Sequence, residues 1–401
     1  MQVEYGQLAL ASQVLRRQQD THTRAIADYI QRYGVLTPSD TGIVMLPFTG
    51  VSLMVAVLGV QAAEMFGQVC SLAADRVDDA ARSYEAHEQQ AYEAAQQLMQ
   101  QIGQGLPPYQ SPLSSSPTLG SAGSSAPADH GGAEPNLIVE IIQTPGAISD
   151  GITGLYDDAT SRLGGWPGGG AVTERSDASS WLVAPNAAKS EIENMRWGAG
   201  PILGGVDWLI EQLIGMSLLE DVIMKPFAGD WTGIEEVQQA WSHVGEAMRA
   251  ISDNGAGLAE TAAFWEGDAG TAYQGGMTAI GLGAFGLGSV ADTVAGLVGQ
   301  LVLASKTAAA TIGFAINQLS QTLLRMALEA TVPIAGWIVA AAEGALAATK
   351  IFGVIRLIYS IINIIYDVIE SVVTARAQLV ENLLRLEDLA QVLVQTARKY
   401  A

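Results

Sequence analysis

The sequence predicts an all-α protein: helical hairpins packed as an elongated bundle, with a disordered Pro/Ser/Gly linker between them. Apolar residues recur at steps of three, four and seven over long stretches, which is the period of a helix with one buried face. Hydrophobic residues make up 49% of the 401 residues and charged residues only 15%, so a sizeable core can form. The stretch 104–135, rich in Pro, Ser and Gly, separates two such helical regions.

Residues 1–103 are expected to form the first hairpin. One face of its first helix carries Leu8, Leu15, His22, Ile26, Tyr29 and Tyr33. Thr37-Pro38-Ser39-Asp40 then predicts a break. A stripe repeating near 3.5 residues marks the second helix, as in a seam between packed helices: Phe66, Cys70, Ala73, Val77, Ala80, Tyr84, Ala91, Ala95, Leu98 and Ile102. Cys70 is the only cysteine, so we interpret it as a small core residue and expect no disulfide within the chain.

Residues 41–63 contain no charged side chain and are long enough to span a bilayer. Pro47 and Gly50 interrupt this run, so a buried turn leading into the second helix explains it equally well. The sequence leaves both interpretations open.

The linker, 104–135, has too few large apolar residues to offset its own ordering entropy, which predicts disorder. Residues 136–200 are expected to be irregular and Gly-rich. The region 201–300 should form a second helical hairpin, whose first helix runs from about 234 to 264 and is weakened by Asn254, Gly255 and Gly257. Residues 301–401 are expected to form apolar and amphipathic C-terminal helices.

Charge and residue content exclude several functions. Lys and Arg number 20 and Asp and Glu 41, so the net charge is −21 and phosphate is repelled, which argues against a nucleic-acid partner. The four histidines show no metal-ligand spacing, and no catalytic constellation stands out, so we expect neither metal, cofactor nor enzymatic activity. Gly281, Gly283 and Gly286 match a dinucleotide-binding pattern, but they follow a predicted helix rather than a strand.

Trp265-Glu266-Gly267 lies between two predicted helices. Gly267 can adopt the positive φ of a sharp turn, and Asp268 can cap the next helix and complement its dipole. Trp265 offers a large ring to wedge between the helices. An ordinary capped helical turn is the alternative interpretation.

Tyr84 and Glu88 form a Y-x-x-x-E pattern late in the second helix, on one helix face. The pattern has poor specificity, since a second copy runs from Tyr366 to Glu370. Tyr84 also falls on the apolar stripe, so a packed core tyrosine is the alternative.

These two patterns resemble known export features. The Trp265 segment resembles the WxG family of helical hairpins exported by actinobacterial type VII (ESX) secretion systems, although Gly270 stands where family members usually have alanine. Tyr84 and Glu88 resemble the type VII export signal, Y-x-x-x-D/E. Residues 1–103 resemble EspC-type proteins, and the distal WxG and apolar region resembles EspA/EspE-type substrates.

The resemblance implies a non-enzymatic protein, secreted or associated with the cell envelope, that acts by binding or assembly. It implies recognition by a type VII secretion ATPase, with a cytosolic chaperone as a possible further partner. A homo-oligomer and contact with a membrane are left open. The N-terminus has no basic region and no apolar core of a Sec signal peptide, which fits such a route. A membrane-active or pore-forming helical protein, and the export region of a secreted toxin, are the rival hypotheses.

In related secreted pairs, two hairpins form a four-helix bundle that brings the WxG turn of one partner near the export signal of the other. Here both hairpins lie on one chain. We therefore hypothesise an intramolecular bundle in which the stripe of 1–103 packs on the 234–290 hairpin, because tethering raises the effective concentration of one for the other to the millimolar range.

Overall fold

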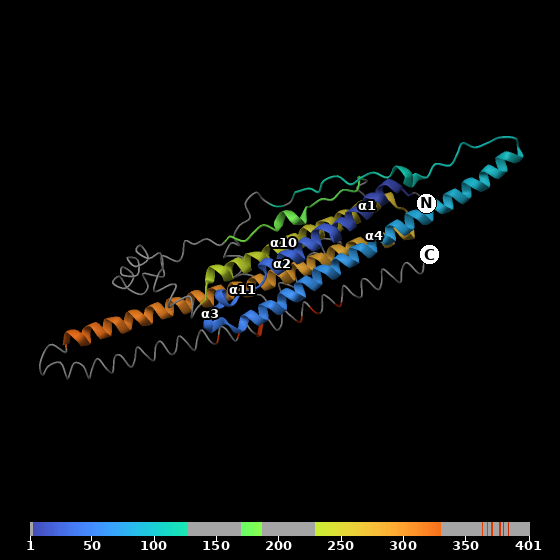
Figure 1. Ribbon diagram of the computed structural model, residues 1–401. Helices are drawn as coiled ribbons and strands as arrows, with labels where there is room; N and C mark the ends of the chain where they lie inside the picture. Colours follow the sequence, from blue (N-terminus) through green and yellow to red (C-terminus); the bar gives the residue numbers. More distant parts are fainter. Residues whose placement is uncertain are drawn as a thin grey trace.

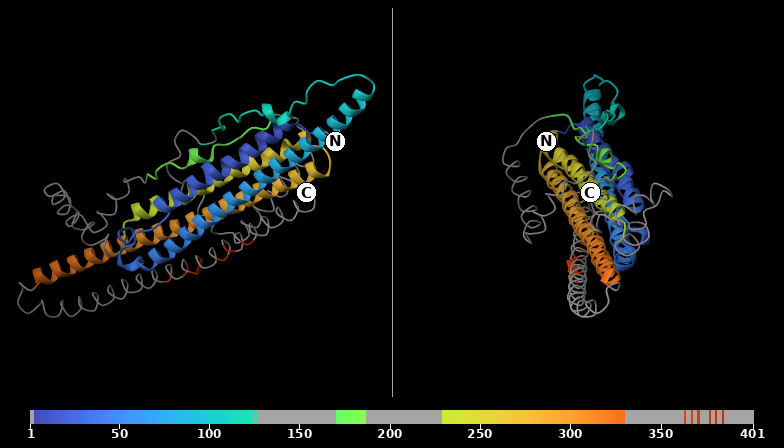
Figure 2. Two further views of the ribbon diagram at one scale, coloured as in Figure 1. Left: turned by 45° about the vertical axis from the view of Figure 1, so that its right-hand side comes forward. Right: turned by 90° about the vertical axis from the view of Figure 1, so that its left-hand side faces the viewer.

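The computed structural model describes residues 3–124, 126, 170–186 and 229–329, together with seven single positions between 363 and 384. Side chains are described up to residue 306 of the last long helix, but not at 43 and 44. Within this part of the chain all regular structure is helical, so the all-α prediction is confirmed. A single β-bridge joins Val3 to Trp265. Four long helical stretches run side by side along one axis (Figures 1 and 2).

The first stretch consists of α1 (Tyr5–Arg17), the π-helix η1 (Gln18–Thr23) and α2 (Arg24–Tyr33). The predicted stripe faces inward, since Leu8, Leu15 and Ile26 are fully buried. Between the two α-helices, η1 buries polar side chains instead, Gln18 and His22 among them. Wider π-helical turns are uncommon and often accompany a specific site.

The predicted break becomes a short helix, α3 (Pro38–Met45), followed directly by α4 (Pro47–Gln101). Thr37 and Asp40 form a capping box at the start of α3, and Gly42 takes a φ of 60° within it. The uncharged run 41–63 is therefore divided between two helices rather than forming one. By length and composition, α4 and residues 268–306 of the last helix could each cross a membrane. In the fold, however, 50% and 61% of the most apolar 18-residue stretch of each is buried.

The described part of the predicted linker, residues 104–124, is irregular apart from η2 (Pro112–Ser115). It differs from a freely disordered linker because it returns along α1 and bonds to it. The side-chain amide of Gln13 donates to the Pro117 carbonyl (2.9 Å) and its oxygen accepts from the Leu119 amide (2.8 Å). Residues 127–135 lie outside the described residues.

Residues 170–186 form an extended strap with one short 3-10 helix, η3 (Ala178–Trp181). Alternate side chains point inward, as they do in a strand: Val172, Glu174, Ser176 and Ala178 are buried. The rest of the predicted irregular segment 136–200 lies outside the described residues.

The second hairpin consists of α10 (Trp231–Glu260), η7 (Ala262–Phe264) and α11 (Asp268–Glu329). Its two long helices make the most extensive contact among the described elements. Glycines permit this close approach: a Cβ on Gly255 would lie 2.8 Å from the Gly281 backbone. Gly281 thus lies inside α11 as a packing residue, and not in a nucleotide-binding loop.

The two hairpins lie against one another, which is the arrangement that the intramolecular hypothesis described. Trp241 of α10 is buried, and its Nε1 donates to the Gly34 carbonyl at 3.0 Å. Its ring fits against Gly59 of α4, where a Cβ would approach a ring carbon to 2.7 Å. Nearby, the Tyr29 hydroxyl lies 2.9 Å from Nδ1 of His243 and donates to the Val183 carbonyl.

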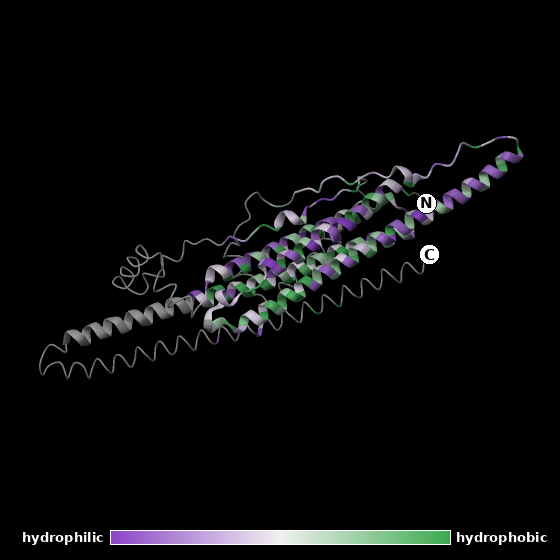
Figure 3. Ribbon diagram, viewed as in Figure 1, coloured by the Kyte–Doolittle hydropathy of each residue, from purple (hydrophilic) through white to green (hydrophobic). Residues whose placement is uncertain are grey.

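The stripe predicted on α4 is only partly buried. Phe66, Cys70, Ala73 and Val77 lie in the core, as predicted, but α4 then outruns the bundle (Figure 1). Beyond that point Ala91, Ala95, Leu98 and Ile102 are exposed, so the seam predicted there is wrong. Figure 3 shows the change, since the first half of α4 is largely hydrophobic and the projecting end largely hydrophilic.

Two glycines on α4 test the interlock, by which we mean the packing of the Trp241 ring against Gly59. We expect Gly59→Ala to lower the free energy of unfolding by roughly 1–3 kcal/mol, because its methyl group would overlap the indole ring. Gly50→Ala on the same helix meets nothing within 4 Å and should raise that free energy by about 0.5 kcal/mol through helix propensity. Chemical denaturation of both variants measures this, and equal effects would contradict the interlock.

Candidate recognition site at the WxG turn

The chain turns between the second pair of helices as the WxG pattern predicts. Trp265 is extended, Gly267 takes a φ of +97°, and α11 begins at Asp268. The prediction that Asp268 caps α11 needs correction, because Asp268 is the first residue of the helix and Gly267 precedes it. Its carboxylate lies in the first turn, where it still complements the helix dipole.

Gly270, where the WxG family usually has alanine, has a local reason in this fold. A Cβ at this position would lie only 1.8 Å from the carbonyl oxygen of Trp265. The first turn of α11 therefore closes so tightly over the preceding strand-like residue that only glycine fits.

Trp265 is the centre of an aromatic cluster at this end of the bundle. It is 7% exposed, and its ring centroid lies 5.5 Å from that of Tyr273, which in turn contacts Phe264 edge-on at 5.7 Å. The N-terminus of the chain closes over it, since the Glu4 amide donates to the Phe264 carbonyl at 3.1 Å. The cluster joins both hairpins at their ends.

The two sequence patterns meet in this cluster. Nε1 of Trp265 donates to the Tyr84 hydroxyl at 3.2 Å, and the two rings pack edge to face with centroids 6.1 Å apart. Tyr84 is half-buried by this contact, whereas Glu88, one turn further along α4, is exposed. Glu266, Gly267 and Asp268 are exposed on the turn beside it. Tyr84 is thus both a packed residue and part of an accessible surface.

The returning linker lies along the same part of α4. The rings of Tyr92 and Tyr109 are 5.5 Å apart, and Ser111 donates a hydrogen bond to the Glu85 carboxylate. Burial of Tyr5, reinforced by the negative charges of Glu88 and Glu85, raises the pKa of its phenol. The segment after Tyr84 therefore carries clustered negative charge on a helix that projects from the bundle.

The second Y-x-x-x-E copy does not share this environment. Tyr366 lies outside the described residues, while Asp367 and Glu370 are exposed positions of a helix. Of the two copies, only the first has its tyrosine placed against the WxG turn by a described contact.

Sequence reasoning missed a buried charged cluster around Glu174. Its side chain is fully buried in the strap and accepts hydrogen bonds from Arg17 (2.5 Å) and Gln18 (2.9 Å), with His22 Nε2 at 2.7 Å. Burial raises the pKa of this carboxyl, but the bonds from His22, Gln18 and Arg17 outweigh it and leave the pKa below its ordinary value. No periodic pattern in the sequence marks this cluster, because the inward positions Glu174 and Ser176 are polar.

Asn254 extends the cluster to α10. Its side-chain amide pairs with the backbone of Ser176, accepting from the amide (2.9 Å) and donating to the carbonyl (2.8 Å), and it also donates to Gln18. The strap, η1 and α10 are thus tied together by fully buried polar groups. Most of these polar atoms are hydrogen-bonded to one another, although His22 Nδ1 has no hydrogen-bond partner among the described residues and lies 3.7 Å from the Asp177 carboxylate.

The described residues contain no group of three or more His, Cys, Asp or Glu side chains able to hold a metal ion. Cys70 is buried, and burial raises the pKa of its thiol, as expected for a core cysteine. Comparison of the chain with known protein families, with curated proteins and with solved structures gives no significant match. The functional argument therefore depends on the geometry of the chain itself.

A double-mutant cycle tests the contact between the two patterns. Trp265→Phe and Tyr84→Phe each remove one partner of the Nε1–H···O bond while keeping an aromatic ring. We expect each to lower the free energy of unfolding by about 1 kcal/mol and the pair to be coupled by roughly 0.5–1 kcal/mol. Urea denaturation measures the cycle; strictly additive effects would mean that the bond contributes nothing.

The Glu174 cluster predicts a specific pH dependence. At pH 7, Glu174→Gln should lower the free energy of unfolding by roughly 3 kcal/mol, because Arg17 and His22 lose a buried charged partner. A carboxyl whose folded-state pKa is lowered stabilises the fold fully above its ordinary value of 4.5, and this contribution is lost as the pH falls through the lowered pKa.

The difference between wild type and variant should therefore shrink steadily in denaturation series taken from pH 6 to acid. Arg175→Gln serves as control, because it removes an ion pair between two partly exposed side chains, Arg175 on the same strap and Glu260 on α10, and it should cost less than about 1 kcal/mol. A difference for Glu174→Gln that is constant with pH would contradict the assignment of charge to Glu174.

Proposed function

We propose that this chain is a substrate of an actinobacterial type VII secretion system that acts by binding or assembly, not catalysis. The observation that carries the proposal is the contact between Tyr84 and Trp265. Two patterns 181 residues apart, each resembling one half of a type VII export feature, share one aromatic cluster. A chance occurrence of either pattern would give no reason for them to be neighbours.

The geometry suggests how a secretion ATPase would read the chain. Glu88 projects from α4 one helical turn beyond Tyr84, about 6 Å along the axis. The exposed residues of the WxG turn lie on the neighbouring hairpin, so both halves of the signal face one partner together. Because Trp265 fixes Tyr84, this surface exists only when the two hairpins are packed, and an unfolded chain would not present it.

The described ionisable groups in the interior favour a binding protein over an enzyme. Glu174 is held by three side chains, and Arg249 of α10 pairs with Asp292 of α11 at 2.5 Å. Both clusters lie between packed elements rather than around an open polar cleft. The toxin hypothesis depends on residues beyond 306, whose side chains are described at only a few positions.

A membrane-active protein is the second candidate, and one observation favours it. Among the described residues, two helices are long and apolar enough to cross a bilayer, and Leu53, Met54 and Val57 of α4 are exposed, as is Leu46 just before it. In that case the protein should release dye from anionic phospholipid vesicles without any secretion system being involved.

Export is the decisive experiment. The full chain would be expressed in an actinobacterium with and without a functional ESX system, and cells, envelope and medium would be assayed. We expect secretion to need the system and to be lost, at least tenfold, in Tyr84→Ala. Glu88→Gln should reduce it similarly, because the exposed carboxylate is the readable part of the pattern.

Glu93→Gln is the matched control, since Glu93 is also an exposed acid on the projecting part of α4 but lies outside the pattern. Circular dichroism of each purified variant separates loss of signal from loss of fold. Equal secretion in strains with and without the system would overturn the proposal. Retention in the membrane fraction in both strains would favour the membrane-active alternative.

A further inference from the structure

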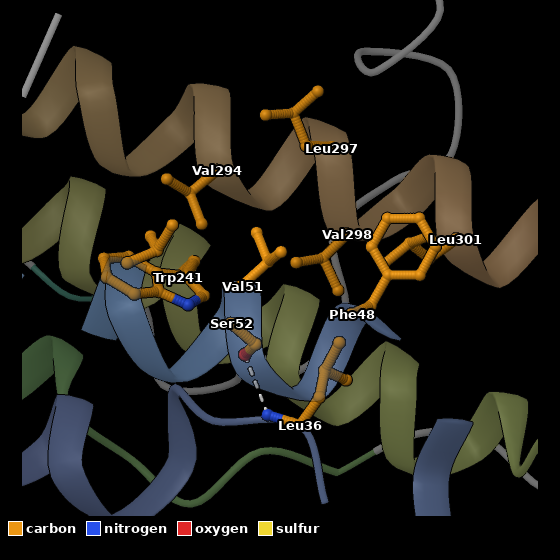
Figure 4. A pocket seen from close by; sticks show the side chains of 10 residues that line it. Leu36, Phe48, Val51, Ser52, Trp241, Val294, Leu297, Val298 and Leu301 are labelled. Carbon is orange, nitrogen blue, oxygen red and sulfur yellow. Dashed lines mark hydrogen bonds between the residues drawn. The ribbon is translucent and has the colours of Figure 1, made fainter. Parts of the chain in front are cut away.

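The two ends of α4 are covered in different ways. Near its start, α4 packs against α11, and only a small cavity of about 30 Å³ remains between apolar side chains such as Phe48, Val294 and Leu301 (Figure 4). Over residues 82–101, by contrast, no residue of α4 is buried. Along this part the returning linker contacts the helix as it doubles back from the helix end (Figure 1). We call the contacting residues, 107–111, the latch segment.

Directional contacts hold the latch segment on α4. The Tyr92 hydroxyl donates to the Pro107 carbonyl, and the Ser111 hydroxyl donates to the Glu85 carboxylate. Between these two bonds, the ring of Tyr109 lies against that of Tyr92, with centroids 5.5 Å apart. The latch segment therefore occupies α4 at two positions that are seven residues apart, which is two turns of one helix face.

These two positions flank the Y-x-x-x-E pattern. Glu85 follows Tyr84 directly, and Tyr92 lies one helical turn beyond Glu88. Steps of three and four residues from Glu85 to Glu88 and on to Tyr92 place all three on one face of α4. Partial burial, reinforced by the negative charges of Glu85 and Glu88, raises the pKa of the Tyr109 phenol. The latch segment thus lies on the face of α4 that carries the pattern.

A partner that reads a helix contacts more than one of its turns. Helices that bind in grooves present anchors at steps of three, four and seven residues. A groove that takes Tyr84 and Glu88 would therefore also meet Glu85 and Tyr92, where the latch segment lies. The partner and the latch segment cannot occupy this face together. Displacement of the latch segment is local and easy, because its contacts with α4 are few and the side chains involved are partly exposed.

We propose that the latch segment restrains the export signal by competing with the secretion ATPase for one face of α4. This inference rests on the proposed function of Tyr84 and Glu88, and it adds how access to them is regulated. A chain with the latch segment in place cannot bind the ATPase through this face. The observed affinity is then the intrinsic affinity multiplied by the fraction of chains that are open, so weakening the latch contacts should tighten binding.

Limited digestion of the full chain with chymotrypsin tests whether the latch segment is held in place. Chymotrypsin cuts after aromatic residues, and the bond after Tyr109 should be protected while its ring packs on Tyr92. Tyr92→Ala leaves the linker sequence unchanged, and we expect cleavage after Tyr109 to be at least fivefold faster in this variant. Glu93→Ala is the control, since Glu93 is exposed and bonds along the helix to Gln89, and it should leave the rate unchanged. Equal rates in wild type and Tyr92→Ala would overturn the proposal.

Binding of the full chain to the purified secretion ATPase of the expressing actinobacterium tests the competition. Tyr109→Ala removes the ring contact without touching the export pattern, and we expect this variant to bind at least threefold more tightly than wild type. Ser111→Ala should change the affinity in the same direction. Ser115→Ala, at an exposed serine of η2, is the control and should bind like wild type. Equal or weaker binding of Tyr109→Ala would overturn the proposal, and weaker binding would mean that the ATPase reads the linker together with the helix.

Tyr84→Ala keeps this proposal apart from the proposed function. We expect it to abolish binding, alone and in combination with Tyr109→Ala. Binding that depends on Tyr84 but is unchanged by Tyr109→Ala would overturn the latch and leave the proposed function standing. Binding that Tyr84→Ala does not lower would overturn the proposed function, and the regulatory role of the latch segment with it.

Discussion

The structure depends on one requirement: each hairpin has an apolar face that packs against the other hairpin. Trp241 shows how closely the two faces are matched. Its indole nitrogen bonds to the Gly34 carbonyl in the turn of the first hairpin, and its ring occupies the space left by Gly59. A glycine opposite a tryptophan is a fit of shape, so sliding one hairpin by a helical turn would lose both the bond and the fit. The interlock thus sets the register of the whole bundle.

That register has a consequence at the other end of the bundle, where it brings together two residues that are 181 apart in sequence. With the hairpins fixed at the Trp241 end, their other ends meet at the aromatic cluster, and Trp265 reaches Tyr84. The strap and the buried Glu174 cluster reinforce the same alignment at mid-bundle, because they join η1 to α10. The proposed export signal, built from both hairpins, would therefore report the state of the fold. A secretion system that reads it would take packed bundles and leave unpacked chains behind.

Local pattern was enough to predict the helices, the turn at Gly267 and the core role of Cys70, because each depends on neighbours within one or two turns. The predictions that failed concerned contacts between residues far apart in the sequence. The seam predicted at Ala91–Ile102 assumed a partner of equal length, but the other helices end earlier. Asn254 and Gly255 were interpreted as weakening a helix, whereas they are where the strap and Gly281 approach it. Glu174 lies 152 residues from His22, and no spacing in one sequence connects them.

The same contacts bear on the membrane-active alternative. The apolar window of α11 includes Asp292, which pairs with Arg249 across the hairpin, and burial raises the pKa of this aspartate above its ordinary value. Moving α11 into a bilayer would break that pair and place Asp292 in hydrocarbon at a cost of roughly 3 kcal/mol. The uncharged start of α4, residues 47–63, carries no such cost, but removing it would uncover Trp241 and the core around it. Membrane insertion therefore competes with the packing of Trp241 against Gly59. If the membrane-active alternative were correct, Gly59→Ala should favour insertion. If the proposed signal requires the packed bundle, Gly59→Ala should instead impair export.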